Sequence, residues 1–169
     1  MALTAGWFLV AAATCLVAVR GRRALRAPVL GGYAVAAVAV GAYLAYATVH
    51  DRVVHERVAA GPVEASATFV SGEHETVGTA RVVRVSGGGR VVTLTGFATS
   101  AGPDLRVRLA PGTGTDGAAA GVVDLGALKG NRGDQQYDLP AGVDARRATV
   151  LIWCRAFSAL FGSAALAPA

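Results

Sequence analysis

Hydrophobic residues are distributed unevenly along this chain. Two long stretches near its start contain no charged side chain. Residues 2–19 and 29–49 contain no Asp, Glu, Lys or Arg. A helix needs about 20 apolar residues to cross the hydrocarbon core of a bilayer, and each stretch has about that length. The pattern predicts two N-terminal transmembrane helices, joined by a short link over residues 20–28.

After residue 50 the pattern changes to short runs of strand-forming residues bounded by glycine and proline. Residues 81–85 and 90–97, separated by Ser86-Gly87-Gly88-Gly89, predict a hairpin. Residues 105–109 alternate leucine or valine with arginine, as expected of a strand with one buried face. Residues 149–154 are apolar on both faces, which favours a fully buried strand, and residues 157–166 continue as a final strand.

Together these patterns predict two N-terminal transmembrane α-helices followed by an all-β domain, a β-sandwich or a barrel-like fold. The expected organisation is a membrane anchor over residues 1–49, a stalk over 50–64 and the β domain over 65–169. Residues 111–121 are rich in Gly, Thr and Ala without periodicity, which predicts a loop. The mean hydropathy of +0.47 is high because of the two apolar stretches.

The net charge of +5 arises mainly from the link between those stretches, which contains Arg20, Arg22, Arg23 and Arg26. From residue 50 onward, twelve basic residues face eleven acidic ones, so the β domain is nearly neutral. Binding to nucleic acid needs Lys and Arg clustered on the domain itself. The charge distribution therefore argues against a DNA or RNA partner and favours a lipid membrane.

The arginine-rich link also predicts an orientation, because short loops rich in arginine remain on the cytoplasmic side. If the link at 20–28 is cytoplasmic, the protein is anchored in the cell membrane and its β domain lies on the extracytoplasmic side. The alternative for residues 2–19 is a cleaved signal peptide, although such peptides have their positive charge before the apolar core. Both interpretations export the β domain. The composition, rich in Ala, Arg and Gly, is typical of a bacterial protein encoded by GC-rich codons.

Five patches of the β domain, in order, resemble the DM-thirteen domain family, whose members are often described as electron-transfer domains. The patches are residues 69–80, 94–105, 125–135, 137–140 and 150–162, including Gly102-Pro103-Asp104-Leu105 and Val150-Leu151-Ile152-Trp153-Cys154-Arg155-Ala156-Phe157. The resemblance implies an extracellular or membrane-attached β domain, found in some proteins beside haem-binding and cytochrome-type modules. It also implies a redox role for one cysteine, which here is Cys154.

Cys154 is the redox candidate, with a structural alternative. The other cysteine, Cys15, lies in the first apolar stretch, so the two are not expected to form a disulfide within one chain. A lone thiol in an oxidising compartment indicates redox chemistry, a metal ligand or a link to a partner. The alternative is a small buried hydrophobic residue, because free cysteine is frequently buried and is then inert.

His74 is the only histidine of the predicted β domain and the second candidate. Imidazole with thiolate suits copper, zinc or iron, so His74 and Cys154 are the residues that would bind a metal. A metal site normally has three or four ligands, and no further strong ligands are evident. The alternative is a surface histidine beside a turn. No cofactor is firmly implied; haem or copper, if used, is expected through a partner.

Asp104 and Trp153 are candidates for lining the site. Gly102-Pro103-Asp104 fits turn chemistry, and the turn could also present Asp104 as a ligand. Trp153 is expected to be a core or rim aromatic residue. Residues 129–133 lack the Gly-Lys-Ser/Thr sequence of a phosphate-binding loop. No nucleophile motif is present, so a conventional enzyme is disfavoured and no catalytic residue is predicted.

Two functions are consistent with these features. The first is a membrane-tethered, extracytoplasmic electron-transfer or cofactor-handling module, whose partner is a membrane redox protein. The second is a non-enzymatic binding module that meets a cell-envelope component through loops such as residues 111–121, with Cys154 purely structural.

Overall fold

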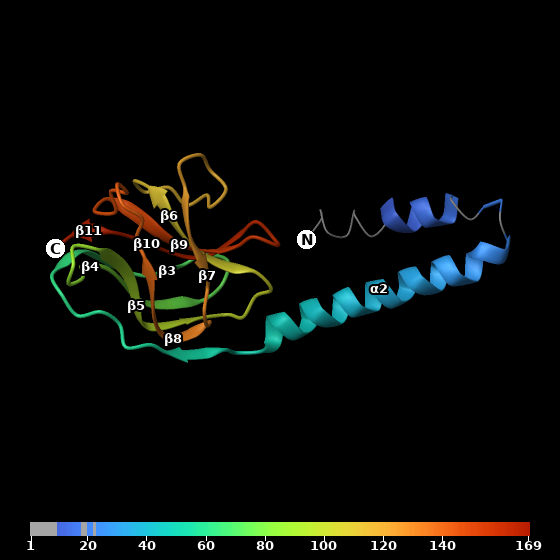
Figure 1. Cartoon of the computed structure of the whole chain (residues 1–169), viewed down its shortest axis with the longest axis horizontal. Helices are drawn as coiled ribbons and strands as arrows, with labels where there is room; N and C mark the ends of the chain where they lie inside the picture. Colours follow the sequence, from blue (N-terminus) through green and yellow to red (C-terminus); the bar gives the residue numbers. More distant parts are fainter. Residues whose placement is uncertain (1–9, 18–19, 22) are drawn as a thin grey trace. The chain divides into compact units, whose positions relative to one another are not determined.

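The computed structural model describes residues 10–17, 20–21 and 23–169 of the chain (Figure 1). The chain divides into two compact units, Met1–Ala47 and Thr48–Ala169. The first unit contains the apolar N-terminal segment and the second contains the strands. The predicted stalk at residues 50–64 belongs to the second unit. It contains the strand Val53–His55 and the first two residues of the strand Val63–Thr68.

The long helix α2 spans Arg23–Val49 and includes the predicted second membrane segment. Within it, Ala24–Val49 is long and apolar enough to cross a membrane, a property shared by membrane anchors and signal sequences. The helix begins earlier than predicted because Arg, Ala and Leu are good helix formers, so the charged residues do not end it. Pro28 lies within its second turn, where only one backbone hydrogen bond is lost.

The predicted pair of transmembrane helices is only partly matched in the structure. Among the described residues, α2 alone has the length and composition of a membrane span. Residues 10–17 are also helical, but this described stretch is too short to cross a bilayer. The remainder of the first predicted span, residues 2–9 and 18–19, lies outside the described residues.

The second unit is an all-β domain with two sheets, as predicted in its sandwich form. One sheet has the strand order β1-β8-β5-β4-β2-β11 and the other has the order β3-β10-β9-β6-β7. The strands are β1 (Val53–His55), β2 (Val63–Thr68), β3 (Val70–Ser71), β4 (Thr76–Arg84), β5 (Arg90–Thr99), β6 (Leu105–Pro111), β7 (Val123–Ala127), β8 (Arg132–Asp138), β9 (Ala148–Cys154), β10 (Ala159–Ala165) and β11 (Ala167–Pro168).

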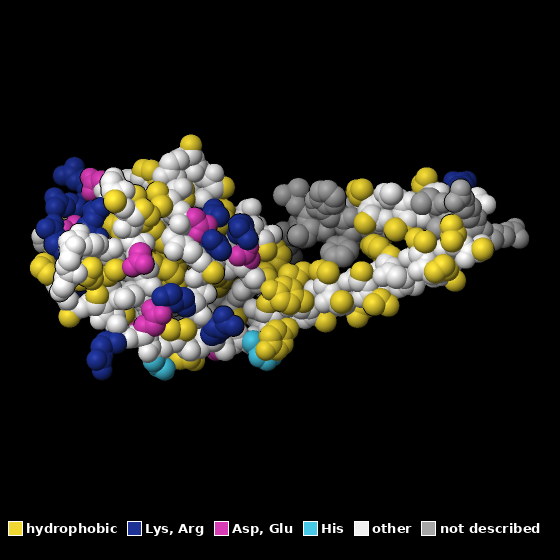
Figure 2. All heavy atoms as spheres, viewed as in Figure 1, with side chains coloured by type: hydrophobic (Ala, Val, Ile, Leu, Met, Phe, Trp, Pro, Cys, Tyr) yellow, Lys and Arg dark blue, Asp and Glu magenta, His cyan; other side chains and the backbone are white. Residues whose placement is uncertain are grey.

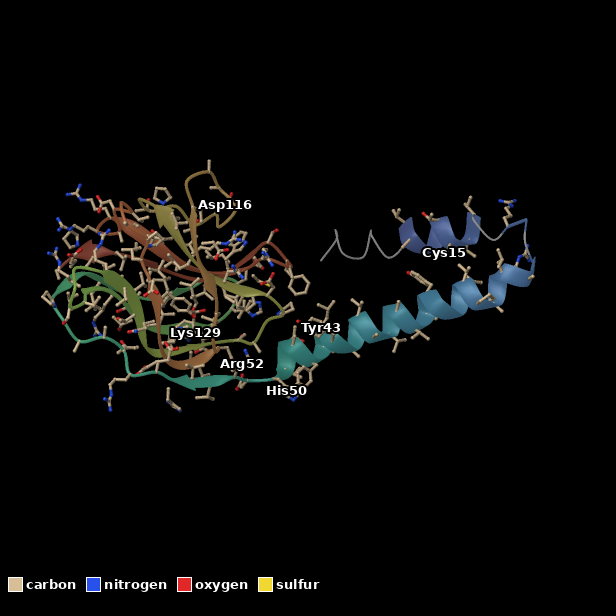
Figure 3. The ribbon with its side chains drawn as sticks, viewed as in Figure 1. Cys15, Tyr43, His50, Arg52, Asp116 and Lys129 are labelled. Carbon is tan, nitrogen blue, oxygen red and sulfur yellow. The ribbon has the colours of Figure 1, made fainter. Side chains whose placement is uncertain are left out.

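Five of these strands confirm predictions from periodicity. Strands β4 and β5 form the expected hairpin around the glycine-rich turn, and β6 alternates buried apolar residues with half-buried arginines. Every residue of β9 is buried, as its apolar faces predicted, and β10 follows it antiparallel. The loop between β6 and β7 contains no strand, and Asp116 projects from it (Figure 3). The remaining strands, β1, β2, β3, β7, β8 and β11, lack the periodicity that predicted the other five.

The core lies between the two sheets and is filled by alternate residues of their facing strands. It includes Val82, Leu94, Val107 and Ile152, all fully buried. Strand β4 has nine residues, so its two ends are about 27 Å apart at ~3.3 Å per residue. The His74 end is defined here by residues 72–75, 100–104 and 155–158, and the Arg84 end by Glu64, Arg84, Arg90 and Arg146.

Candidate functional site

Cys154 is the last residue of β9 and is completely buried. Its Cα partners are Leu105 on β6 and Ala159 on β10, so a strand lies on each side of it. It belongs to the group of apolar residues that forms the core between the sheets. The thiol forms no disulfide. The structure therefore places Cys154 inside the sandwich at its His74 end, out of contact with solvent.

His74 lies in the loop between β3 and β4, where it is partly exposed. Its imidazole stacks on the ring of Phe161 with a centroid separation of 3.9 Å and an interplanar angle of 30°. Phe161 is only 2% exposed and belongs to the same core group as Cys154. Stacked aromatic rings at this separation stabilise one another. His74 thus lies at the protein surface and contacts, through Phe161, the core group that contains Cys154.

Thr76 anchors the His74 loop through a small buried polar network. Its hydroxyl donates to the carbonyl of Phe161 at 3.0 Å and lies 2.8 Å from the hydroxyl of Thr99. Its backbone N–H donates to Oγ of Ser71 at 3.0 Å. Because Thr76 is 1% exposed, these bonds replace those it would make with water. They hold the loop against β10, and the imidazole consequently lies over Phe161.

Asp104 lies in the turn before β6, as predicted from Gly102-Pro103-Asp104. Its Oδ2 accepts a hydrogen bond of 2.6 Å from Nε of Arg155, and its backbone carbonyl accepts one of 2.9 Å from the Arg155 N–H. Arg155 directly follows Cys154 in the chain. The ion pair is largely exposed, so its contribution to stability is small. Asp104, just before β6, is therefore hydrogen-bonded to Arg155, just after β9, and links the two strand ends.

Trp153 lies on the opposite face of the sheet from Cys154, because successive side chains of a strand point to opposite faces. It is 7% exposed and is covered by the loop between β6 and β7. Gly117 of that loop lies against the indole, where a Cβ would overlap the ring. Trp153 is therefore a buried aromatic residue on the outer face of its sheet. The Cys154 side chain points to the inner face of the same sheet.

The His74 end therefore brings together three of the four predicted site residues: Cys154, His74 and Asp104. Within residues 10–17, 20–21 and 23–169, no group of three or more His, Cys, Asp or Glu side chains is arranged to hold a metal ion. His74 is engaged with an aromatic ring, and Asp104 with an arginine. The His74–Phe161 stack connects the surface at this end to the core group that also contains Cys154.

A hollow of about 440 Å³ lies at the same end, beside the His74 loop. Its lining includes Asp51, Glu75, Thr99 and Arg132. Hydrogen bonds from Asn131 (2.7 Å) and then Arg132 (2.8 Å) hold the pKa of Asp51 below its ordinary value, so this carboxylate stays charged. The hollow is thus polar and borders the segment that leads into β1.

A buried polar network fixes the turn at residues 129–133 and the strand β8 that follows it. Gln135 is fully buried, donates to the carbonyl of Gly130 at 2.8 Å and accepts from the hydroxyl of Tyr137 at 2.8 Å. Burial raises the pKa of Tyr137 to about 12. Lys129 lies on the turn beside this network and pairs with Glu56 at 2.7 Å (Figure 3). These residues shape a turn and contact no thiol.

Residues 68–166 match the model of the family described as Electron transfer DM13. No curated protein and no solved structure matches the chain. The matched region covers more than half of the chain, from the end of β2 to just beyond β10, and it contains all four predicted site residues. The chain therefore belongs to the Electron transfer DM13 family.

Proposed function

We propose that this protein is a membrane-tethered electron-transfer module whose β domain lies outside the cytoplasm and whose redox group is the Cys154 thiol. The observation that carries the proposal is the family match across the sandwich that encloses this sulfur. The tether is supported by the length and apolar composition of α2. The orientation is supported by Arg20, Arg22, Arg23 and Arg26, which favour the cytoplasmic side.

Burial limits the chemistry open to this thiol. Disulfide exchange, metal binding and oxidation to sulfenic acid all require that another atom contacts the sulfur, and Cys154 is 0% exposed. Electron transfer needs no bond to the sulfur. In the proposed step the thiol loses one electron and its S–H proton, leaving a thiyl radical. The electron passes to a strongly oxidising haem-type acceptor on a partner membrane redox protein. Because Cys154 is 0% exposed, the proton passes to water only when the His74 end opens transiently.

The stack of His74 on Phe161 provides the route by which the electron reaches the surface. Phe161 packs in the same core group as Cys154, and His74 is partly exposed at the same end. A partner that docks at the His74 end would lie on the side of the sandwich where β9 ends at Cys154. His74 is a positioning residue for the partner, and Cys154 supplies the electron.

The electron-transfer proposal is tested by mixing the full-length chain in detergent with hexachloroiridate(IV), a high-potential one-electron acceptor. Wild-type protein should reduce it in a single-exponential phase, which the Cys154→Ala variant should lack. The matched control is Cys15→Ala, which removes the other thiol and should leave the rate unchanged. Equal rates for wild type and Cys154→Ala would refute the role of this thiol.

The orientation is tested separately by labelling intact cells with a membrane-impermeant maleimide. Ala141 is exposed on the β domain and Gly21 is exposed in the arginine-rich link, so each accepts a cysteine without disturbing a core. In a Cys15→Ala background, the Ala141→Cys variant should label in intact cells and the Gly21→Cys variant only after lysis. The reverse result would place the β domain in the cytoplasm.

A second function is favoured by one specific observation, the full burial of Cys154 in the apolar core. In this alternative the sulfur is a core atom, and the protein is a non-enzymatic binding module that contacts a cell-envelope component through the loop between β6 and β7. Such a module would leave hexachloroiridate(IV) unreduced, and the Cys154→Ala variant would bind the partner as wild type does.

A further inference from the structure

The Arg84 end of the sandwich carries a cluster of three arginines around one glutamate. Glu64 lies where the pairing of β2 with β4 shifts register between Val63 and Ala65. A β-bulge of this kind re-aims a side chain, and the Glu64 side chain is only 8% exposed. The guanidinium groups of Arg84, Arg90 and Arg146 all face its carboxylate.

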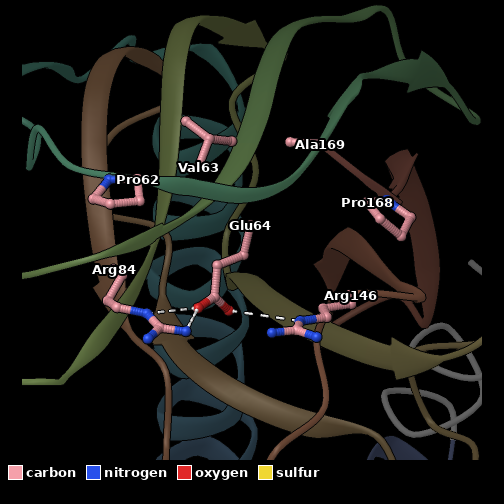
Figure 4. A pocket seen from close by; sticks show the side chains of 7 residues that line it. All are labelled: Pro62, Val63, Glu64, Arg84, Arg146, Pro168 and Ala169. Atoms are coloured by element: carbon pink, nitrogen blue, oxygen red, sulfur yellow. Dashed lines mark hydrogen bonds and ion pairs between the residues drawn. The ribbon is translucent and has the colours of Figure 1, made fainter.

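Of the three arginines, Arg84 alone donates hydrogen bonds to the Glu64 carboxylate. Nε of Arg84 donates to Oε1 at 2.8 Å, and Nη2 of Arg84 donates to the same oxygen. Nη1 of Arg90 and Nε of Arg146 lie 3.9 and 4.0 Å from Oε2, which is beyond hydrogen-bond distance. Figure 4 shows Glu64 between Arg84 and Arg146. The hydrogen bonds from Arg84 hold the pKa of Glu64 below its ordinary value, so it remains charged.

The other contacts of the cluster fix its geometry. Nη2 of Arg90 donates to the carbonyl of Val143 at 2.8 Å, which holds this guanidinium in place. The backbone N–H of Arg146 donates to Oδ1 of Asp144 at 3.1 Å. Arg90 is 23% exposed at its side chain, whereas Arg146 is 58% exposed. Several N–H donors of these two arginines are therefore directed to space that water or a ligand can occupy.

Two hollows adjoin the cluster and share three of its residues, Glu64, Arg84 and Arg146. One has a volume of about 370 Å³ and is also lined by Pro62, Val63, Pro168 and Ala169. The other has about 470 Å³ and is also lined by Arg90, Gly142, Val143 and Asp144. Each lies within the size range of small-molecule sites. Figure 2 shows several arginine side chains, in dark blue, at this end of the domain.

We propose that Arg84, Arg90 and Arg146 form a binding site for a small multivalent oxyanion, a phosphoryl or carboxylate group, with Glu64 as the internal brace. The three arginines exceed the two carboxylates of the site, Glu64 and Asp144, by one positive charge. An oxyanion between Arg90 and Arg146 would accept the N–H donors that Glu64 leaves unused, and guanidinium forks match phosphate and carboxylate geometry. The site is independent of the electron-transfer proposal, because it lies at the opposite end of β4.

The test is a calorimetric titration of the full-length chain in detergent with inorganic phosphate and, separately, with citrate, at ionic strength fixed with NaCl. Saturable binding of either anion is expected, and Arg146→Gln should weaken it at least tenfold. The matched control is Arg57→Gln, which alters an exposed arginine outside the cluster and should leave binding unchanged.

A second variant keeps the test decisive. Glu64→Gln removes the competing negative charge, so it should tighten anion binding. Thermal unfolding of each variant without anion checks that it folds, and Arg146, being exposed, is expected to tolerate the change. Binding of phosphate assigns a phosphoryl ligand and binding of citrate alone assigns a carboxylate ligand; both support the site. Absence of saturation, or equal affinity in Arg146→Gln, overturns it.

Discussion

Replacing the Cys154 sulfur by oxygen tests how dry the core is around this residue. The Cys154→Ser variant keeps nearly the same shape but puts a hydroxyl where Leu105 and Ala159 flank β9 within an apolar group. A buried hydroxyl without a partner costs about 1–3 kcal/mol. The Cys154→Ala variant deletes one heavy atom without adding a polar one, and should cost about 1 kcal/mol. Serine should therefore destabilise the domain at least as much as alanine does.

The assay is urea unfolding of the full-length chain in detergent, followed by tryptophan fluorescence in a Trp7→Phe background. The chain has two tryptophans, so the remaining signal comes from Trp153, next to Cys154 in β9. Free energies come from linear extrapolation at unchanged m. Ala141→Ser adds a hydroxyl at an exposed position and should stay within about 0.5 kcal/mol of wild type. A Cys154→Ser variant as stable as wild type would refute the dry-core reasoning.

Three further predictions follow from single contacts. Tyr137 should ionise near pH 12 in an absorbance titration. Its raised pKa stabilises the fold fully below pH ~10, and this stabilisation is lost as the pH rises through about 12, so Tyr137→Phe should flatten the dependence. Gly117→Ala should push the loop off Trp153 and shift its fluorescence to longer wavelength, whereas Gly114→Ala, whose Cβ would lie 3.3 Å from the carbonyl of Pro111 and 3.6 Å from Cβ of Ala110, should not. Cys154 should react with a thiol reagent only after denaturation, because it is 0% exposed; rapid labelling of the native chain would contradict that burial.

Periodicity predicted the strands whose residues alternate or are uniformly apolar, and it failed where polar networks replace apolar packing. Strand β8 contains Gln135, which is fully buried because Tyr137 and Gly130 satisfy its amide. Nothing in a local pattern distinguishes such a residue from an exposed one. Strand β1 was missed for another reason: it pairs in parallel with β8, about eighty residues away, and is only three residues long.

The same distinction applies to the candidate site. Burial of Cys154 was one of two predicted outcomes, because its apolar neighbours in β9 are adjacent in sequence. The stack of His74 on Phe161 depends on the pairing of β3 with β10, which no local pattern records. The arginine cluster at Glu64 draws on residues from position 64 to position 146. No local sequence pattern marks these residues as a cluster, because the fold alone brings their charged side chains together.

The central claim is that this domain exchanges one electron at the Cys154 sulfur. Voltammetry of the full-length protein in a lipid film on an electrode measures this exchange directly. A one-electron wave is predicted for wild type and for the Cys15→Ala variant, and it should be absent in Cys154→Ala. A film without a wave, or a wave that persists in Cys154→Ala, would contradict the account and leave Cys154 as a core residue of a binding module.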